Sequence, residues 1–267
     1  MSLVVSLRIP DGVVIAADSL STLQGHLAVK THMQAKCPKC KEDLTFGNPP
    51  ALQMPVPLST SSFAQKLFPL CSRFGVGAYG WSLLSNRTVG YYIETLNNEI
   101  KSKEIAGVTD AAQLILDKFD RLIHDCISDI GNAPEDYFPM GFHVAGYDDS
   151  EGKTIEVKIG KNSRLESINE LGCAVSGSGN VVAKLWELGE ENESHKANFG
   201  IFSLQDAIDY ADFLISATAS YQRFAQMIPN VGGEVDIALV TQYQGFTWIR
   251  QKKLARILLG KDGNADE

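Results

Sequence analysis

The sequence lacks the features that would place this chain in a membrane or on nucleic acid. No run of about 18 consecutive apolar residues occurs, which is the length that a helix needs to cross a bilayer. Lysine and arginine number 24 against 32 acidic residues, leaving a net charge of −8, and no basic cluster with interleaved aromatic residues is present. Binding to a phosphate backbone needs such positive charge. We therefore expect no membrane association and no nucleic-acid partner.

Cysteine is scarce, and a targeting signal is missing. The cysteines number five, and Cys71, Cys126 and Cys173 lie inside apolar runs. An odd number of cysteines in such surroundings is typical of reduced thiols in a cytosol. The first residues carry no basic segment ahead of an apolar stretch, as a secretory signal would. We therefore expect a cytoplasmic protein.

Internal repeats are also absent, and the composition is that of a compact chain. With 267 residues, of which 44% are hydrophobic, the chain can bury one large core and needs no second domain. We expect a single domain over residues 2–250, interrupted by an inserted loop at about 23–62. Residues 251–267 are expected to form a C-terminal tail.

Residues 3–17 predict a tight hairpin. An apolar, β-branched run over residues 3–9 precedes the turn signal Pro10-Asp11-Gly12, and a second apolar run covers residues 13–17. Both runs are nearly continuous, which is typical of strands covered on both faces. Asp18 follows as a charge at the edge of a buried sheet, where a carboxylate that only ends the strand is also common.

Ser2 is a candidate nucleophile. If Met1 is removed, Ser2 carries a hydroxyl and a free amine on one residue. A hydroxyl needs a base to take its proton, and an α-amino group with a pKa of roughly 7.7–8.0 can serve. A small residue at position 2 usually permits methionine removal, so we expect this step alone to expose the nucleophile.

The rest of the chain predicts helices grouped between pairs of strands. Ser203 and Asp206 form the start signal of the last helix. The expected helices span 81–103, 109–130, 180–188 and 204–225. The expected strands span 142–147, 154–159, 235–241 and 246–249, with one more ending at 176. This order favours an α+β four-layer sandwich, sheet against sheet with helices outside.

Five motifs in order carry a family resemblance that covers nearly the whole chain. They are the hairpin ending Ala16-Ala17-Asp18-Ser19, the segment Gln65–Leu70, the strand Phe74–Trp81, the turn Val175–Gly179 and the strand Gly232–Thr241. Together they resemble the proteasome β-subunit and HslV family of N-terminal nucleophile hydrolases. The resemblance implies an αββα sandwich of two antiparallel sheets, the Ntn-hydrolase fold.

The resemblance also implies an activity and a set of site residues. Ser2 takes the nucleophile's place and Gly80 that of the oxyanion-hole N–H. Lys66 corresponds to the lysine beside the nucleophile, Asp18 to the acid that orients it, and Ser178 to the serine of the Gly-Ser-Gly turn. The implied enzyme is an endopeptidase that needs no cofactor. It would cleave peptides or unfolded proteins inside a homo-oligomeric ring or stack, with an unfolding ATPase as partner.

Three departures separate this chain from the family pattern. Serine replaces threonine at the nucleophile, so the methyl group that restricts χ1 is missing. Residues 227–231 read Met-Ile-Pro-Asn-Val where the family has an aspartate and a serine that support the amine. The third departure is the insertion of some thirty residues.

The insertion contains a candidate metal motif. Cys37 and Cys40 provide half of a tetrahedral zinc site, which His26 and His32 would complete. A redox or disulfide role for the two cysteines, and a solvated loop that holds no metal, are the alternatives. Because the insertion precedes Lys66, we expect it near the substrate cleft.

Two other functions fit the same residues. The chain is a non-catalytic structural subunit of a proteasome-like assembly if Met1 stays on. It is an amidase or transpeptidase on the same scaffold if the acyl group passes to an acceptor other than water.

Overall fold

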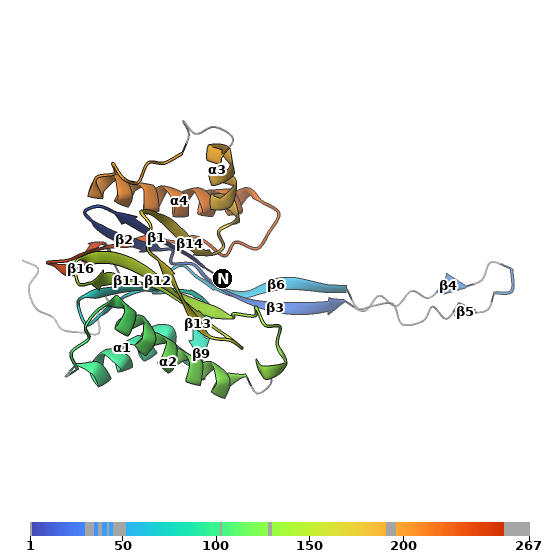
Figure 1. Cartoon of the computed structure of the whole chain (residues 1–267). Coiled ribbons are helices and arrows are strands. Elements are labelled where there is room, and N and C mark those ends of the chain that lie inside the picture. The colour runs from blue at the N-terminus through green and yellow to red at the C-terminus, as the bar shows by residue number, and fades with distance from the viewer. Residues whose placement is uncertain are drawn as a thin grey trace, which may run out of the picture. The chain divides into compact units, whose positions relative to one another are not determined.

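The computed structural model describes residues 2–29, 35–36, 39–41, 43–44, 52–101, 103–127, 130–190 and 196–253 (Figure 1). The chain divides into two compact units. The larger comprises Met1–Ser21 and Ser61–Glu267, and the smaller comprises Thr22–Thr60. The smaller unit covers nearly the same residues as the expected insertion, and the site described below belongs to the larger unit.

The first of two five-stranded sheets in the larger unit contains the N-terminal hairpin. Its strand order is β14-β1-β2-β15-β16, and all neighbours are antiparallel. Pairing of Val4 with Ala17 through Ile9 with Gly12 confirms the predicted hairpin. The strands are β1 (Leu3–Ile9), β2 (Gly12–Ala17), β14 (Gly172–Gly177), β15 (Asp236–Thr241) and β16 (Gly245–Arg250).

The second sheet has the order β13-β12-β11-β8-β7 and is also antiparallel. The strands are β7 (Leu67–Leu70), β8 (Phe74–Gly80), β11 (Met140–Asp148), β12 (Glu151–Ile159) and β13 (Arg164–Ile168). Strand β13 was not predicted, because five residues containing two charges give little periodic signal. Its pairing with β12 creates the strand.

Helices cover the outer face of each sheet (Figure 1). Helices α3 (Asn180–Glu190) and α4 (Leu204–Phe224) pack on the first sheet through one apolar cluster. Helices α1 (Val89–Ile100) and α2 (Val108–Cys126) pack on the second sheet through another, and the 3-10 turn η1 (Ile130–Asn132) follows. The described residues thus form a mixed α/β structure with antiparallel sheets and four α-helices, which is compatible with the expected α+β sandwich.

The start of helix α4 confirms its prediction. Ser203 accepts a hydrogen bond from the backbone N–H of Asp206, and the Asp206 carboxylate accepts from the backbone N–H of Ser203. This reciprocal capping box satisfies two donors that the first turn of a helix leaves without partners.

The first predicted helix, over residues 81–103, is wrong at its N-terminal end. Helix α1 begins at Val89, and the preceding residues form a short hairpin of β9 (Leu83–Leu84) and β10 (Arg87–Thr88). Ser85 and Asn86 at its tip have φ angles of 46° and 62°, in a left-handed region that ends helical continuity. The Thr88 hydroxyl then caps the helix by accepting from the N–H of Tyr91 at 3.2 Å. The next predicted helix, over 109–130, begins at Val108 and ends at Cys126.

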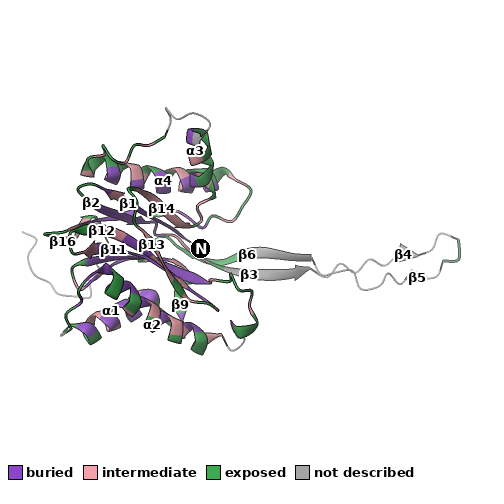
Figure 2. Ribbon diagram, in the orientation of Figure 1, coloured by how far each residue is buried: buried purple, intermediate pink, exposed green. Residues whose placement is uncertain are grey.

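Alternation along the strands decides which side chains enter the space between the sheets. On β1, Val5 and Leu7 face the helix side, whereas Val4 belongs to a separate cluster between the sheets. Buried residues line both sheets (Figure 2). On β8, Gly77 faces the same space, and a Cβ built there would lie 2.7 Å from a methyl carbon of Val4. The sheets therefore approach so closely at this point that only glycine fits.

The smaller unit contains two pairs of strands. Strands β3 (Ser21–Val29) and β6 (Leu52–Ser61) pair with each other, and β4 (Ala35–Lys36) pairs antiparallel with β5 (Asp43–Leu44). Among the residues that the structure describes, no helix is both long and apolar enough to cross a membrane.

Candidate active site

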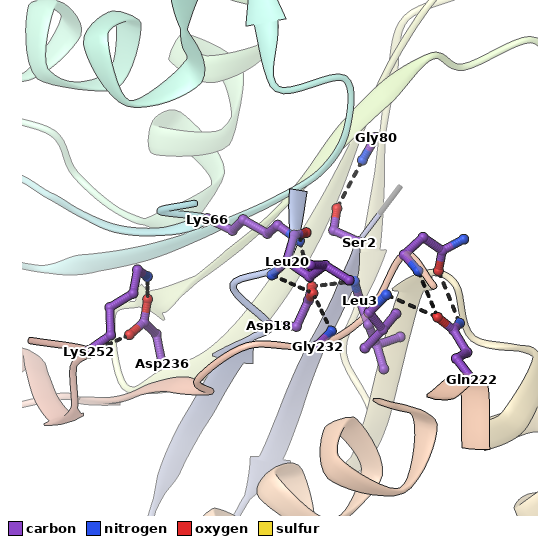
Figure 3. A network of polar contacts seen from close by, with 12 residues as sticks. Ser2, Leu3, Asp18, Leu20, Lys66, Gly80, Gln222, Gly232, Asp236 and Lys252 are labelled. Carbon is purple, nitrogen blue, oxygen red and sulfur yellow. Dashed lines mark hydrogen bonds and ion pairs between the residues drawn. The ribbon is translucent and has the colours of Figure 1, made fainter. Parts of the chain in front are cut away.

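Ser2 lies at the start of β1 and faces the second sheet. It is 2% exposed, and its backbone carbonyl accepts a hydrogen bond from the N–H of Ser178 at 2.8 Å. Residues Ser2, Val4 and Ser6 share one face because successive side chains of a strand alternate. The hydroxyl of Ser2 therefore points toward the end of β8 in the opposite sheet (Figure 3).

Gly80 meets Ser2 from that opposite sheet. Its backbone N–H donates to Ser2 Oγ at 3.3 Å. The φ angle of Gly80 is +86°, and a Cβ there would lie 2.3 Å from the carbonyl oxygen of Pro139. Only glycine can adopt this conformation without a clash. A hydroxyl and an aimed N–H, the first two predicted site groups, are thus brought together.

Asp18 is fully buried and has four partners. Its Oδ1 accepts from the backbone N–H of Leu3 at 3.0 Å and from Lys66 Nζ at 2.7 Å. Its Oδ2 accepts from the backbone N–H groups of Leu20 at 3.1 Å and Gly232 at 3.0 Å. The carboxylate therefore holds the residue that follows Ser2, the lysine and the Gly232 loop around one centre (Figure 3).

Lys66 is a buried cation just before β7. Its Nζ donates to Asp18 and to the carbonyl oxygen of Leu20. Its own carbonyl accepts from the N–H of Ala78 at 2.7 Å, which links it to β8 two residues before Gly80. Burial lowers the pKa of the Lys66 amine below its ordinary value, the charge and hydrogen bond of Asp18 oppose this, and repulsion from Lys252 adds to it.

A second buried ion pair, which the sequence did not reveal, lies beside the end of β2. Lys252 donates through Nζ to Asp236 Oδ2 and through its backbone N–H to Asp236 Oδ1 at 2.8 Å. Asp236 pairs with Ala17, the residue before Asp18. The acid lies inside one of the resemblance motifs, but Lys252 falls in the stretch expected as a tail. No local pattern marks a lysine two residues after a strand as buried.

In the segment 227–231, which lacks the aspartate and serine of the family pattern, Asn230 is held by the amide side chain of Gln222 from helix α4. Gln222 Oε1 accepts from the backbone N–H groups of Asn230 at 2.9 Å and Val231 at 3.0 Å. Its Nε2 donates to Asn230 Oδ1 at 3.0 Å. Both side chains are buried, so they hold the loop that leads to Gly232 and hence to Asp18. Gln222 lies near the end of the helix predicted over residues 204–225, where no local signal distinguishes it from a solvated side chain.

Ser178 is placed through its backbone. Leu3 pairs with Gly177, whose φ of +92° turns the chain so that the Ser178 N–H reaches Ser2. A Cβ at Gly177 would lie 1.9 Å from the Ser2 carbonyl oxygen. The Gly-Ser-Gly turn is therefore in direct contact with the candidate nucleophile's main chain.

The candidate metal motif lies largely outside the described residues. Cys37, His32 and the side chain of His26 belong to that part, whereas Cys40 is exposed and has a free thiol. Over the described ranges, no group of three or more His, Cys, Asp or Glu side chains is arranged to hold a metal. The zinc site stays a prediction.

No protein-family model matches the chain, and no curated protein matches it at a significant level. A function must therefore be argued from the geometry of Ser2, Gly80, Lys66 and Asp18.

Proposed function

We propose that this chain is an N-terminal-nucleophile endopeptidase of proteasome type with the Ntn-hydrolase fold. The observation that carries the proposal is the Gly80 N–H directed at Ser2 Oγ. The Lys66–Asp18 ion pair, tied to the N–H of Leu3, supports it. Gly80 reaches the Ser2 hydroxyl from 78 positions further along the chain, and the Lys66–Asp18 pair binds the N–H of the next residue, Leu3. This arrangement is the one that the motif order implies.

The mechanism begins with removal of Met1, which frees the Ser2 amine. Ser2 Oγ attacks the carbonyl carbon of a peptide, and the amine takes the hydroxyl proton directly or through water. The Gly80 N–H stabilises the oxyanion, an effect worth about 2.7–4 kcal/mol of barrier. The amine then protonates the leaving nitrogen, and water hydrolyses the acyl-enzyme to regenerate Ser2.

Lys66 and Asp18 have separate tasks in this mechanism. The positive charge of Lys66 disfavours protonation of the nearby amine, which keeps it available as a base. Asp18 holds Lys66 in place and fixes Leu3, so that the neighbouring Ser2 cannot shift along β1. The assembly proposed with this activity is a homo-oligomeric ring or stack that admits unfolded chains, with an unfolding ATPase as partner.

The test begins with the intact mass of the protein from its natural host, which must show that Met1 is absent. A peptide epoxyketone, which reacts with both the hydroxyl and the amine, should then label Ser2. Ser2→Ala should abolish labelling and peptide hydrolysis with an unchanged unfolding midpoint. Ser220→Ala, at an exposed position of α4, should leave both unchanged.

The remaining outcomes separate the alternatives. A retained Met1 together with no labelling would remove the peptidase and favour a structural subunit. Transfer of the acyl group to an added amine, in place of free acid, would instead favour an amidase or transpeptidase.

A further inference from the structure

Besides the Asp18–Lys66 pair, five polar side chains connect the two sheets. His143 on β11 is fully buried, with Nδ1 3.0 Å from Ser6 Oγ and Nε2 2.9 Å from Ser176 Oγ. Ser176 Oγ donates to Glu156 Oε1 at 2.5 Å. Tyr79 Oη donates to the same carboxylate oxygen at 2.7 Å. We call this set, Tyr79, Glu156, Ser176, His143 and Ser6, the polar bridge.

Every hydrogen bond of the polar bridge donates in the direction of Glu156. Because Ser176 gives its proton to the carboxylate, it accepts from Nε2–H of His143. The Nδ1 atom then accepts from the hydroxyl of Ser6. Burial lowers the pKa of His143 to about 4, which agrees with this neutral form. Burial alone would raise the pKa of Glu156, but the hydrogen bonds from Ser176 and Tyr79 together with the nearby charge of Lys158 lower it on balance, so its charge is retained.

The bridge ends beside the proposed active site on both sheets. Tyr79 directly precedes Gly80, whose N–H donates to Ser2 Oγ. Ser176 lies two residues before Ser178, whose N–H holds the Ser2 carbonyl. One carboxylate oxygen of Glu156 thus joins the ends of β8 and β14, the two strands that present N–H groups to Ser2.

A nucleophilic role for the bridge serines does not fit. His143, the base that such a role would need, is 0% exposed, and both of its ring nitrogens are engaged by Ser6 and Ser176. The protons of the serine hydroxyls are already committed to His143 and Glu156. A buried polar set of this kind is also a poor source of stability, because well-packed apolar side chains of equal volume usually do as well. Its satisfied hydrogen bonds instead define one relative position of the elements they join.

We propose that the polar bridge positions the oxyanion donor relative to the nucleophile, with Tyr79 and Glu156 as its positioning residues. The inference rests on the proposed function, since the quantity it controls is the placement of Gly80 N–H against Ser2. Misplacing a catalytic group by about 1 Å can reduce a rate by about 100-fold. The tyrosine hydroxyl and the Glu156 charge therefore act on the rate of acylation without contacting substrate.

Two variants test this role in the assembled protein with Met1 removed. Tyr79→Phe removes one hydroxyl, and Glu156→Gln removes the charge while conserving shape. Both should reduce kcat for peptide hydrolysis about 10- to 100-fold, with KM within about twofold of the parent value. The matched control is Tyr147→Phe. Tyr147 lies on β11 on the same face as His143 but takes no part in the polar bridge, so this substitution should change neither kcat nor KM.

A second measurement, hydrogen exchange of the Gly80 and Ser178 amides, keeps the inference independent of catalysis. These amides should exchange faster in Tyr79→Phe than in the parent or in Tyr147→Phe. If parent protein is inactive and unlabelled, the proposed function fails, yet faster exchange still supports the positioning role. Unchanged kcat in both variants of an active enzyme overturns the inference. If the parent chain is inactive, unchanged exchange of the Gly80 and Ser178 amides in Tyr79→Phe overturns the inference.

Discussion

Two buried carboxylates, Asp18 and Asp236, each have an ammonium group and backbone N–H groups as partners. Asp18 accepts four hydrogen bonds, three of them from backbone N–H groups, and its side chain is 0% exposed. Asp236 has both an ammonium and a backbone N–H from Lys252. Removing one member of such a pair leaves the other charge buried and unpaired, which costs far more than the pair contributes.

Asp18→Asn should therefore destabilise the fold strongly. The substitution leaves Lys66 without its anion and places an amide group against N–H donors, so we expect a loss of about 3–5 kcal/mol in unfolding free energy. Urea denaturation at neutral pH measures this loss of unfolding free energy. Asp212→Asn, which breaks the exposed ion pair with Arg250, should cost about 1 kcal/mol or less. Equal losses in the two variants would contradict the prediction.

His143 should make the protein acid-sensitive within a defined range. Burial keeps its pKa at about 4, against 6.5 as the ordinary value, with Glu156 opposing and Lys158 adding to the effect. Between these values the unfolded chain binds a proton that the native chain excludes. The contribution of His143 to stability should therefore be complete above pH 6.5 and fall by about 3 kcal/mol toward pH 4.

Urea titrations at several pH values test this range. In His143→Gln the pH dependence between 6.5 and 4 should be flatter by the same amount. In His124→Gln, which replaces an exposed histidine of α2, it should match the parent. Identical slopes in the two variants would show that His143 does not titrate as stated.

At the scale of secondary-structure elements, the sequence predicts where a helix begins when a capping residue marks its first turn. The start of α4 was predicted correctly because Ser203 and Asp206 form a complete capping box. The start of α1 was missed because apolar residues at helical spacing continue into the β9–β10 hairpin. Its two left-handed residues, Ser85 and Asn86, end the helical path regardless of periodicity.

Ser203→Ala should destabilise helix α4 by about 1 kcal/mol, since it removes the side-chain acceptor for the Asp206 N–H. Chemical denaturation of the whole protein reports the loss, because α4 packs on β1 and β2. Ser220→Ala in the same helix provides the control and should be neutral or slightly stabilising, given the better helix propensity of alanine. A neutral Ser203→Ala would mean that the cap contributes nothing to the native helix.

At the scale of the whole larger unit, the distance between the sheets controls the site. Ser2 belongs to one sheet and Gly80 to the other, so the 3.3 Å contact depends on how closely the sheets pack. Glycines at 75 and 77 permit this approach, since a Cβ at either would come within 3 Å of Ile15 or Val4.

Gly77→Ala should separate the sheets locally and cost about 1–3 kcal/mol of stability, as overpacking of a dense core does. A fall in the thermal midpoint measures the cost, and a fall in Ser2 labelling by the epoxyketone measures the effect on the site. Gly172→Ala on β14 has open space around the added methyl group and should show neither change. Comparable losses for both glycines would point to backbone entropy rather than sheet spacing.

The sequence by itself determined the hairpin, the faces of its strands and the helix α4. These depend on alternation, turn residues and caps within about twenty consecutive positions. Through motif order it also singled out Ser2, Asp18, Lys66, Gly80 and Ser178, which the structure places around one hydroxyl and one ion pair.

Only the tertiary structure decided which other side chains support that centre. No local pattern distinguishes Lys252, Gln222 and Glu156 from solvated residues. They lie in the expected tail, in helix α4 and in strand β12. Their partners are Asp236, Asn230 and the pair Tyr79 and Ser176. Burial of a polar group is set by what packs over it, and that follows from contacts between segments far apart in the chain.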